Sequence, residues 1–414
     1  MHVIKNSVIY LGSSILNKLI PFLLLPVMTK YLSPQEYGAL SIYMILITLY
    51  GAFIGMNIHI NVSKNFFEVP KQEMALYIGN MLFIVSISCT VYFFLTVIGI
   101  QFFDTVFSIE SDWLLAIPII SIMMMVNNIN ISILRNEGKA YTYGIFEISN
   151  TLVNMSVTLL FLLFFNFGWH SQIIGIFAGY FLFFIIGTVY MYKRGYINVR
   201  VDVSKIKSLL AVSLPLIPHV LGAVIITMSD RIFIERMISL EAVGIYSVGY
   251  MFGMVVMLFT DAFIKAWSPW FFKNLAEPTD SKKKKIVKYT YIYIIGVFIL
   301  ALLISLLSET VLPYFVDETF YGAHEYILWI SLGYAVHGVY KIFFPYLVHI
   351  SKTSFLAFST MTAAVLNLIF NYIFIAQFGA IGAAYATILA FSVSAVLVFW
   401  YQKINFQMPW LKST

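Results

Sequence analysis

Charged side chains are scarce in this sequence. Asp, Glu, Lys and Arg make up 11% of the 414 residues, whereas hydrophobic residues make up 61%. An ordinary soluble domain has about 25% charged residues, and its interior could not hide so many apolar side chains. The composition therefore excludes a soluble fold and predicts an integral membrane protein, in which Phe and Tyr fill lipid contacts and interfacial belts.

Cysteine and catalytic motifs are also nearly absent. Cys89, in the apolar run FIVSISCTVYFF, is the single cysteine, so no internal disulfide can form and we interpret this side chain as packing. The sequence has no Cys/His ligand set, no nucleophile–base set and no Gly-rich phosphate loop. We therefore expect no metal, no cofactor and no enzymatic activity.

Long polar segments are missing as well. No gap between apolar runs exceeds about 20 residues, which leaves no room for a catalytic domain outside the membrane. The net charge of +6 lies in short tracts rather than along one amphipathic face, so we expect no nucleic-acid partner. Lys18 interrupts the first apolar stretch and no small-residue cleavage site follows it, so we expect a retained first helix rather than a signal peptide.

The sequence has instead many apolar runs long enough to cross a bilayer. A spanning helix needs about 20 mainly apolar residues, and these runs lack the alternation of outer-membrane barrel strands. We predict an all-α integral membrane fold with twelve transmembrane helices, at residues 7–29, 38–62, 75–100, 113–134, 141–166, 171–192, 208–229, 242–266, 287–307, 325–350, 354–376 and 380–401.

The distribution of Lys and Arg predicts the orientation. With a cytoplasmic N-terminus, nineteen of the 25 basic residues fall in the inside gaps and three, Lys30, Arg231 and Arg236, fall in the outside gaps. Because basic residues collect on the cytoplasmic side, we predict that both termini are cytoplasmic.

The chain also repeats itself. A shift of 206 residues brings TKYLSPQEYGALSIYMI onto ERMISLEAVGIYSVGYM, so that Ser33 meets Ser239 and Gly38 meets Gly244. The first and seventh spans each carry two prolines (Pro21 and Pro26; Pro215 and Pro218), which should bend both helices and make them hinge candidates. Asn154 and Asn367 each follow a basic residue by fifteen positions. We predict two six-helix lobes, 1–200 and 201–414, related by a parallel repeat.

Several of these motifs resemble those of a known family. YLSPQEYGALSIY, SLPLIPH, MSDRIFIERMISLEAVGIYSVGYMF and AVLNLIFNYIFIAQFGAIGAAYAT are similar to segments of polysaccharide-unit flippases. These are the Wzx-type O-antigen transporters, which share a superfamily with MATE drug exporters and the peptidoglycan lipid flippase. The resemblance covers nearly the whole chain and implies a MATE-like, V-shaped pair of six-helix lobes in a bacterial inner membrane.

The resemblance also implies a function. Such proteins move undecaprenyl-pyrophosphate-linked oligosaccharide repeat units from the cytoplasmic to the periplasmic leaflet, by alternating access, for synthesis of O-antigen or a related surface polysaccharide. The implied partners are the lipid-linked oligosaccharide, membrane lipid, a polysaccharide polymerase and a chain-length regulator. Coupling to a proton or sodium ion is a further expectation.

Charged residues inside the spans are the first candidates for the site, because each is costly in the membrane. Lys18 and Lys341 are candidates for pairing with the substrate phosphate, although each could instead snorkel to a membrane face. Asp261 and Lys265 lie four residues apart and can pair on one helix face. Glu147 and Asp261 are the candidates for binding a coupling ion.

Polar residues supply a second group of candidates. Asn57, His59, Asn128 and His219 could hydrogen-bond sugar hydroxyls, or could only join neighbouring helices. Asp230 and Arg231, in the SDR motif at the outer end of the seventh span, are expected to form a gate or a salt bridge at the helix end.

Two other functions stay open at this point. A MATE-type drug or cation exporter, or the peptidoglycan lipid flippase, would share the fold; a drug exporter would favour an acidic cavity, whereas three intramembrane Lys outnumber two acids here. A membrane-bound polysaccharide polymerase would need a long periplasmic loop, which this chain lacks.

Overall fold

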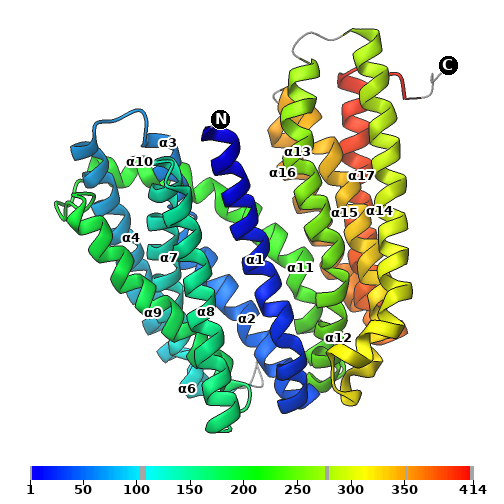
Figure 1. Ribbon diagram of the computed structural model, residues 1–414, viewed down its shortest axis with the longest axis horizontal. Coiled ribbons are helices and arrows are strands. Elements are labelled where there is room, and N and C mark those ends of the chain that lie inside the picture. Colours follow the sequence, from blue (N-terminus) through cyan, green and yellow to red (C-terminus); the bar gives the residue numbers. More distant parts are fainter. Residues whose placement is uncertain (1, 102–108, 276–278, 351, 411–414) are drawn as a thin grey trace. The chain divides into compact units, whose positions relative to one another are not determined.

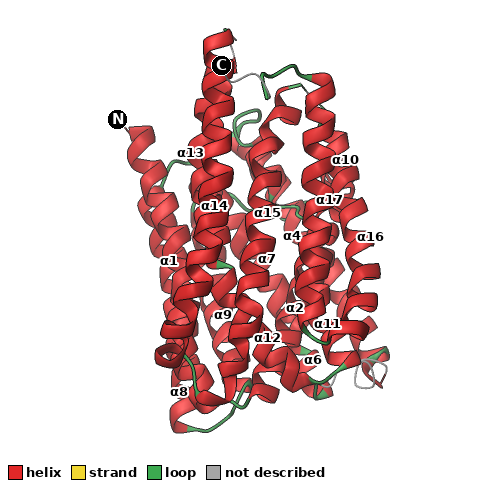
Figure 2. Ribbon diagram, turned by 90° about the vertical axis from the view of Figure 1, so that its right-hand side faces the viewer, coloured by secondary structure: helices red, strands yellow, loops and turns green. Residues whose placement is uncertain are grey.

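The computed structural model describes residues 2–101, 109–275, 279–350 and 352–410, and within these ranges every regular element is a helix (Figure 2). This confirms the predicted all-α fold. Helices suit a hydrocarbon environment because they satisfy their backbone hydrogen bonds internally. The side chains of Lys18, Pro21 and His219 lie outside the described residues.

The chain divides into two compact units. The first comprises Met1–Leu32 and Ala39–Leu221, and the second comprises Ser33–Gly38 and Gly222–Thr414. The division falls inside a helix, whereas the internal repeat predicts a boundary at residue 200. That repeat boundary stays a prediction.

The first unit contains the helices of the N-terminal half (Figure 1). They are α1 (His2–Tyr31), most of α2 (Pro34–Gly55), α3 (Ile60–Asn65), α4 (Lys71–Ile98), α6 (Ser111–Leu114), α7 (Ala116–Asn136), α8 (Ala140–Phe164), α9 (His170–Lys193), α10 (Val203–Ser213), the 3-10 turn η1 (Leu214–Leu216) and the start of α11 (Ile217–Met237). A cluster of buried apolar side chains in this unit includes Ile54, Ile78, Met81, Ile129 and Met191.

The second unit contains the rest of α11 and the later helices. They are α12 (Leu240–Gly253), α13 (Val255–Leu275), α14 (Asp280–Phe315), the 3-10 helix η2 (Glu318–Ala323), α15 (His324–His349), α16 (Thr353–Phe378) and α17 (Ile381–Asn405). Helix α15 contacts α12, α13, α14, α16 and α17. It is therefore the central helix of this unit and the one on which its interior side chains converge.

The observed helices fall on the twelve predicted spans. In the described residues, ten helices are long and apolar enough to cross a membrane, and a bent pair, Val203–Leu216 with Val220–Met237, can form an eleventh span. Helix α1 covers the remaining predicted span. The pair bends by 42°. Pro215 and Pro218 lie at or beside the break and explain it, because proline lacks the backbone N–H that a continuous helix needs. Helix α1 continues through Pro21 and Pro26.

One predicted span differs from the structure. The stretch 38–62 was expected to be a single helix, but α2 ends at Gly55 and α3 starts at Ile60. Met56 and Asn57 between them have positive φ angles of 47° and 52°. Asn tolerates the left-handed conformation better than most residues, which explains why an apolar run can turn here.

Candidate functional site

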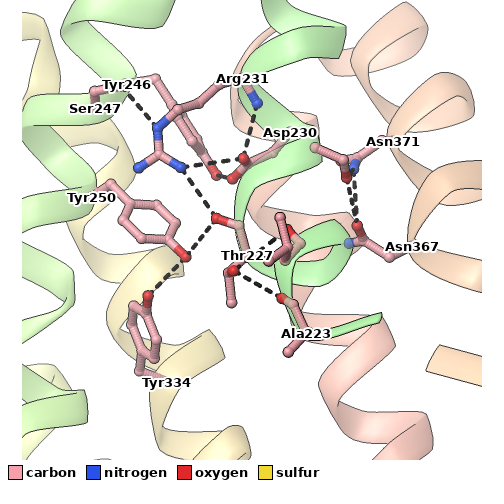
Figure 3. A network of polar contacts seen from close by, with 12 residues as sticks. Ala223, Thr227, Asp230, Arg231, Tyr246, Ser247, Tyr250, Tyr334, Asn367 and Asn371 are labelled. Atoms are coloured by element: carbon pink, nitrogen blue, oxygen red, sulfur yellow. Dashed lines mark hydrogen bonds and ion pairs between the residues drawn. The ribbon is translucent and has the colours of Figure 1, made fainter. Parts of the chain in front are cut away.

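Asp230 forms a buried ion pair in α11 (Figure 3). Tyr246 donates a hydrogen bond to its carboxylate at 2.8 Å, and the backbone N–H of Arg231 donates another at 2.8 Å. The Arg231 guanidinium lies 3.4 Å from the same carboxylate, and the Arg231 and Asp230 side chains are 12% and 0% exposed. A buried charge pair is tolerated only with such additional hydrogen bonds.

Arg231 extends this contact into a network across three helices. Its Nε donates to Ser247 at 3.0 Å, and its guanidinium lies 4.1 Å from the centroid of the Tyr250 ring. Tyr250 donates to the carbonyl of Thr227 at 3.1 Å and accepts from Tyr334 at 2.7 Å (Figure 3). The network therefore joins α11, α12 and α15. A gating role for Asp230 and Arg231 stays a prediction.

A second polar contact joins α11 to α16. Ser229 donates to the side-chain oxygen of Asn367 at 3.1 Å, and Asn371 donates to the same oxygen at 3.1 Å. The internal repeat singled out Asn367, and its counterpart Asn154 accepts hydrogen bonds from Thr158 at 3.2 Å and Gln172 at 3.3 Å. Both asparagines join helices inside their own unit, as polar side chains commonly do in membrane proteins.

The Tyr network borders a small cavity within the second unit. Its lining residues are Tyr246, Tyr250, Ile330, Tyr334, Ala384, Thr387 and Phe391. The Thr387 hydroxyl has no hydrogen-bond partner among the described residues. The empty volume of this cavity is about 190 Å³, which is too small for an oligosaccharide head group.

A second ion pair joins α13 to α15. The Lys341 ammonium lies 2.5 Å from the Asp261 carboxylate, and the two side chains are 21% and 28% exposed. The pair is therefore neither sealed nor fully solvated, and a competing anion could reach the lysine. Lys265 lies one turn beyond Asp261 and is exposed. The pairing of Lys265 with Asp261 stays a prediction. The structure pairs Asp261 with another sequence candidate, Lys341.

His337 lies one turn before Lys341. Its ring stacks on Phe391 at 4.3 Å between centroids, and its Nδ1 is buried without a hydrogen-bond partner among the described residues. The side chains of Tyr334, His337 and Lys341 recur every three or four residues, which places them on one face of α15. Tyr334, which lines the cavity, and Lys341, which pairs with Asp261, therefore project from the same face of α15.

Glu147 in α8 has partners that the sequence did not indicate. Asn17 in α1 donates to its carboxylate at 3.0 Å, and Thr151 donates to Asn17 at 3.1 Å. The carboxylate is thus held at the contact between α1 and α8.

The asparagines of α7 differ in exposure. The amides of Asn127 and Asn130 are buried, whereas the candidate Asn128 is partly exposed.

The break between α2 and α3 carries two further candidates. Asn57 and His59 are partly exposed, and the side-chain nitrogens Nδ2 of Asn57 and Nδ1 of His59 have no partner among the described residues. Burial and the nearby Arg135 guanidinium lower the pKa of His59. His59 is therefore a neutral imidazole at pH 7 and has polar atoms left to bind a hydroxyl group.

Several residues of these clusters escaped the sequence analysis. Asn17, His337 and the tyrosines Tyr246, Tyr250 and Tyr334 were not named as candidates. The spacing of Tyr246 from Tyr250, and of His337 from Lys341, is four residues, so each pair shares a helix face. Their partners lie on other helices, however, and no sequence signal identifies those partners.

Family models match most of the chain. The model described as polysaccharide biosynthesis protein matches residues 3–275, and the model described as MatE matches residues 215–373. A protein of the Lsg locus of Haemophilus influenzae is 26% identical over 98% of this chain and 99% of its own length. The "probable low-salt glycan biosynthesis flippase Agl15" of Haloferax volcanii is 28% identical over 43% of this chain and 38% of its own length.

Solved structures with the same fold include two kinds of transporter. A multidrug resistance MATE family transporter of the MOP superfamily, in an inward-facing conformation, has a TM-score of 0.73 at 14% identity and covers 94% of each chain. The lipid II flippase MurJ has a TM-score of 0.71 at 16% identity, over 97% of this chain and 87% of its own. At these identities the likeness shows the MATE-like fold alone.

Proposed function

Because the chain belongs to the polysaccharide biosynthesis protein family, we propose that it flips lipid-linked oligosaccharide units across the membrane. The substrate we propose is an undecaprenyl-pyrophosphate-linked repeat unit for O-antigen or a related surface polysaccharide. It moves from the cytoplasmic to the periplasmic leaflet of a bacterial inner membrane, by alternating access and without enzymatic chemistry. The lipid tail stays in the bilayer, so only the charged, hydroxyl-rich head group needs a polar path.

The match of residues 3–275 to the polysaccharide biosynthesis model carries this proposal. The similarity to a relative named as a glycan biosynthesis flippase also supports the proposal. The charges retained inside the spans support it physically, because an anionic head group crossing about 30 Å of hydrocarbon needs compensating cations.

We assign the phosphate-binding role to lysines. Lys341 is already paired with Asp261 at 2.5 Å. A pyrophosphate can therefore replace this carboxylate, and the Lys341 ammonium keeps an anionic partner throughout the exchange. Lys18 has the same proposed role on the evidence of its position in the first span. Asn57, His59, Asn128 and His219 are the proposed contacts to sugar hydroxyls.

Ion coupling is part of the proposal. Glu147 and Asp261 are acids held inside the helical units by named partners, Asn17 and Lys341. Each can exchange a proton or a sodium ion for its present partner. A polysaccharide polymerase and a chain-length regulator are the proposed protein partners, since flipped units must be joined at the periplasmic face.

Deletion of the gene in its host tests the function. We expect single lipid-linked repeat units to accumulate on the cytoplasmic leaflet and long-chain surface polymer to disappear, with both effects reversed by the gene on a plasmid. Leaflet location is measured with a membrane-impermeant enzyme that modifies the glycan. Normal surface polymer in the deletion strain would contradict the proposal.

A multidrug exporter is the second candidate, because the MatE model matches residues 215–373. In that case the deletion strain would become sensitive to cationic dyes, and its lipid-linked glycans would keep their normal distribution between leaflets. The same strain therefore distinguishes the two functions.

A further inference from the structure

An apolar edge projects from the first unit outside its membrane spans. Val199 and Val201 lie between α9 and α10 and are 85% and 49% exposed, and Val203 at the start of α10 is 63% exposed. Phe67, between α3 and α4, is 78% exposed. Exposed apolar side chains are expected on lipid-facing helices, but Phe67, Val199 and Val201 lie beyond the ends of the candidate spans.

The backbone of this edge is held firmly against α4. The N–H of Asn198 donates to the carbonyl of Ala75 at 3.2 Å. The carbonyl of Asn198 lies where a Cβ on Gly79 would be, at 1.7 Å, so only glycine permits this approach. The valines are therefore presented by a fixed segment and not by a loose loop.

Asn80 completes the attachment. Its side chain is fully buried and donates to the carbonyl of Arg200 at 3.1 Å, while it accepts from the N–H of Asp202 at 2.9 Å. Asp202 then caps α10 by accepting from Ser204 and Lys205. The contacts fix residues 198–202 on both sides of Val199 and Val201.

Basic residues lie in the same connection as the valines and at the start of α4, to which that connection is attached. Arg194 and Arg200 are exposed in the same connection, and the Lys71 ammonium lies 4.9 Å from the centroid of the Tyr196 ring. Glu137 pairs with Lys139 at 2.8 Å and with Arg194 at 3.8 Å, and Arg194 also donates to the Tyr190 hydroxyl at 3.0 Å. In the described part of the chain, no ion pair joins Lys71 or Arg200 to a carboxylate. Among the acids nearby in sequence, Glu73 pairs with Lys205 and Asp202 caps α10, which leaves Glu68 exposed, so positive charge is in excess.

This combination matches one kind of environment. Apolar side chains flanked by Lys and Arg are favoured where acyl chains meet anionic head groups. Figure 1 shows α3 and α10 at one end of the first unit and α6 at the other, and the end with α3 and α10 is the one predicted to be cytoplasmic. A water-exposed segment would have no reason to keep three neighbouring valines outward.

We propose that the edge formed by Val199, Val201 and Val203, with Lys71, Arg194 and Arg200, binds the head-group layer of an anionic bilayer. The valines enter the boundary of the acyl chains, Lys71 and Arg200 contact lipid phosphates, and Arg194 adds positive charge from its place beside Glu137. The occupant is an anionic phospholipid surface. This anchor sets the depth of the connection from α9 to α10, and it does not depend on the substrate that the protein carries.

Fluorescent labelling in nanodiscs tests the proposal. Cys89 is the single cysteine, so Cys89→Ser with Val199→Cys or Val201→Cys places one environment-sensitive probe on the edge. Nanodiscs contain phosphatidylcholine alone or with phosphatidylglycerol, each with a lipid quencher in the head-group region. We expect quenching at both positions, about twofold stronger with phosphatidylglycerol because basic residues attract the anionic surface. The exposed Glu318→Cys serves as the comparison site.

A matched pair of charge variants completes the test. Lys71→Gln with Arg194→Gln and Arg200→Gln should abolish the phosphatidylglycerol dependence at Val201→Cys. Lys284→Gln with Lys285→Gln and Lys288→Gln removes the same charge from α14 and should preserve it. Probes that stay in water in both lipids would overturn the proposal, as would equal effects of the two charge variants. Shielding that arises only between labelled copies, detected by energy transfer, would identify a second copy as the occupant and would also overturn it.

Discussion

Gly38 and Gly244 contact each other's helices reciprocally. A Cβ on Gly38 would lie 2.0 Å from the carbonyl oxygen of Leu240, and a Cβ on Gly244 would lie 1.9 Å from the carbonyl oxygen of Pro34. The shift of 206 residues that aligns the repeated phrases carries Pro34 onto Leu240 and Gly38 onto Gly244. The contact between residues 34–38 and 240–244 is therefore the same on both sides, and it lies within the second compact unit.

Both copies also begin in the same way. Ser33 accepts a hydrogen bond from the N–H of Glu36 at 3.2 Å, and Ser239 accepts one from the N–H of Ala242 at 3.1 Å. Each serine caps a helix start, α2 or α12, five residues before the glycine. Each copy of the phrase thus encodes a capped helix start, and the serine and the glycine of each copy belong to the second compact unit.

Alanine at either glycine should destabilise the protein. Because the added Cβ meets a backbone oxygen, the helices must separate, and we expect a loss of about 1–3 kcal/mol for Gly38→Ala or Gly244→Ala. Unfolding by sodium dodecyl sulfate in mixed micelles measures the change. Gly51→Ala and Gly296→Ala are matched controls, since nothing lies within 4 Å of a Cβ at either position. An unchanged midpoint for both contact variants would contradict the close approach.

The Asp230 network predicts unequal effects for two conservative changes. Tyr246→Phe removes one hydrogen bond to a buried carboxylate and should cost about 1–3 kcal/mol of stability. Arg231→Lys should cost at least as much. Lysine cannot reproduce the hydrogen bonds of Arg231 to Ser247 and to the Thr227 carbonyl, or its stacking on Tyr250. Thermal unfolding in detergent measures both changes, and Tyr314→Phe, at an exposed position, is the control. A Tyr246→Phe midpoint equal to that of the control would contradict the role of the hydrogen bond.

The Asp261–Lys341 pair predicts a separation between folding and transport. Lys341→Ala removes the ion pair with Asp261, so both stability and flipping should fall. Lys341→Arg keeps the charge and should retain more flipping. Flipping is measured in proteoliposomes with a fluorescent lipid-linked glycan.

Combining Asp261→Asn with Lys341→Gln removes both charges and should restore stability toward that of the unmodified protein, but not flipping. Restored flipping in this neutral pair would refute the phosphate-binding role. For Lys18, the corresponding expectation is that Lys18→Ala reduces flipping more than Lys18→Arg does.

His59 predicts a dependence of stability on pH. Its pKa is lowered from 6.5 by burial and by Arg135, so the unfolded chain binds a proton at a higher pH than the folded protein. The contribution of His59 is therefore complete above pH 6.5 and is lost as the pH falls below that value. We expect His59→Gln to flatten the stability curve in the pH range below about 6.5. Identical slopes for the two proteins in that range would contradict the prediction.

Periodicity and composition were sufficient for the membrane helices. Each of the twelve predicted spans overlaps one helix or two consecutive helices, because a run of about 20 apolar residues has few stable alternatives in a bilayer. The Pro pair in LPLIPHV likewise marked the bend before Val220, since the loss of a backbone donor is a local property. The sequence did not predict the turn at Met56 and Asn57, because an apolar run contains no signal for positive φ angles at these residues.

Local polarity along the chain was enough to identify side chains that are too polar for a membrane span or its end, namely Asp230, Arg231, Asp261, Lys341 and Glu147. Their partners could be found only from the packing of the helices. Asp261 meets Lys341 on α15, and Glu147 meets Asn17 on α1, across 80 and 130 residues of chain. Local patterns specify the face of a helix, whereas the residue opposite that face depends on how helices distant in sequence pack together.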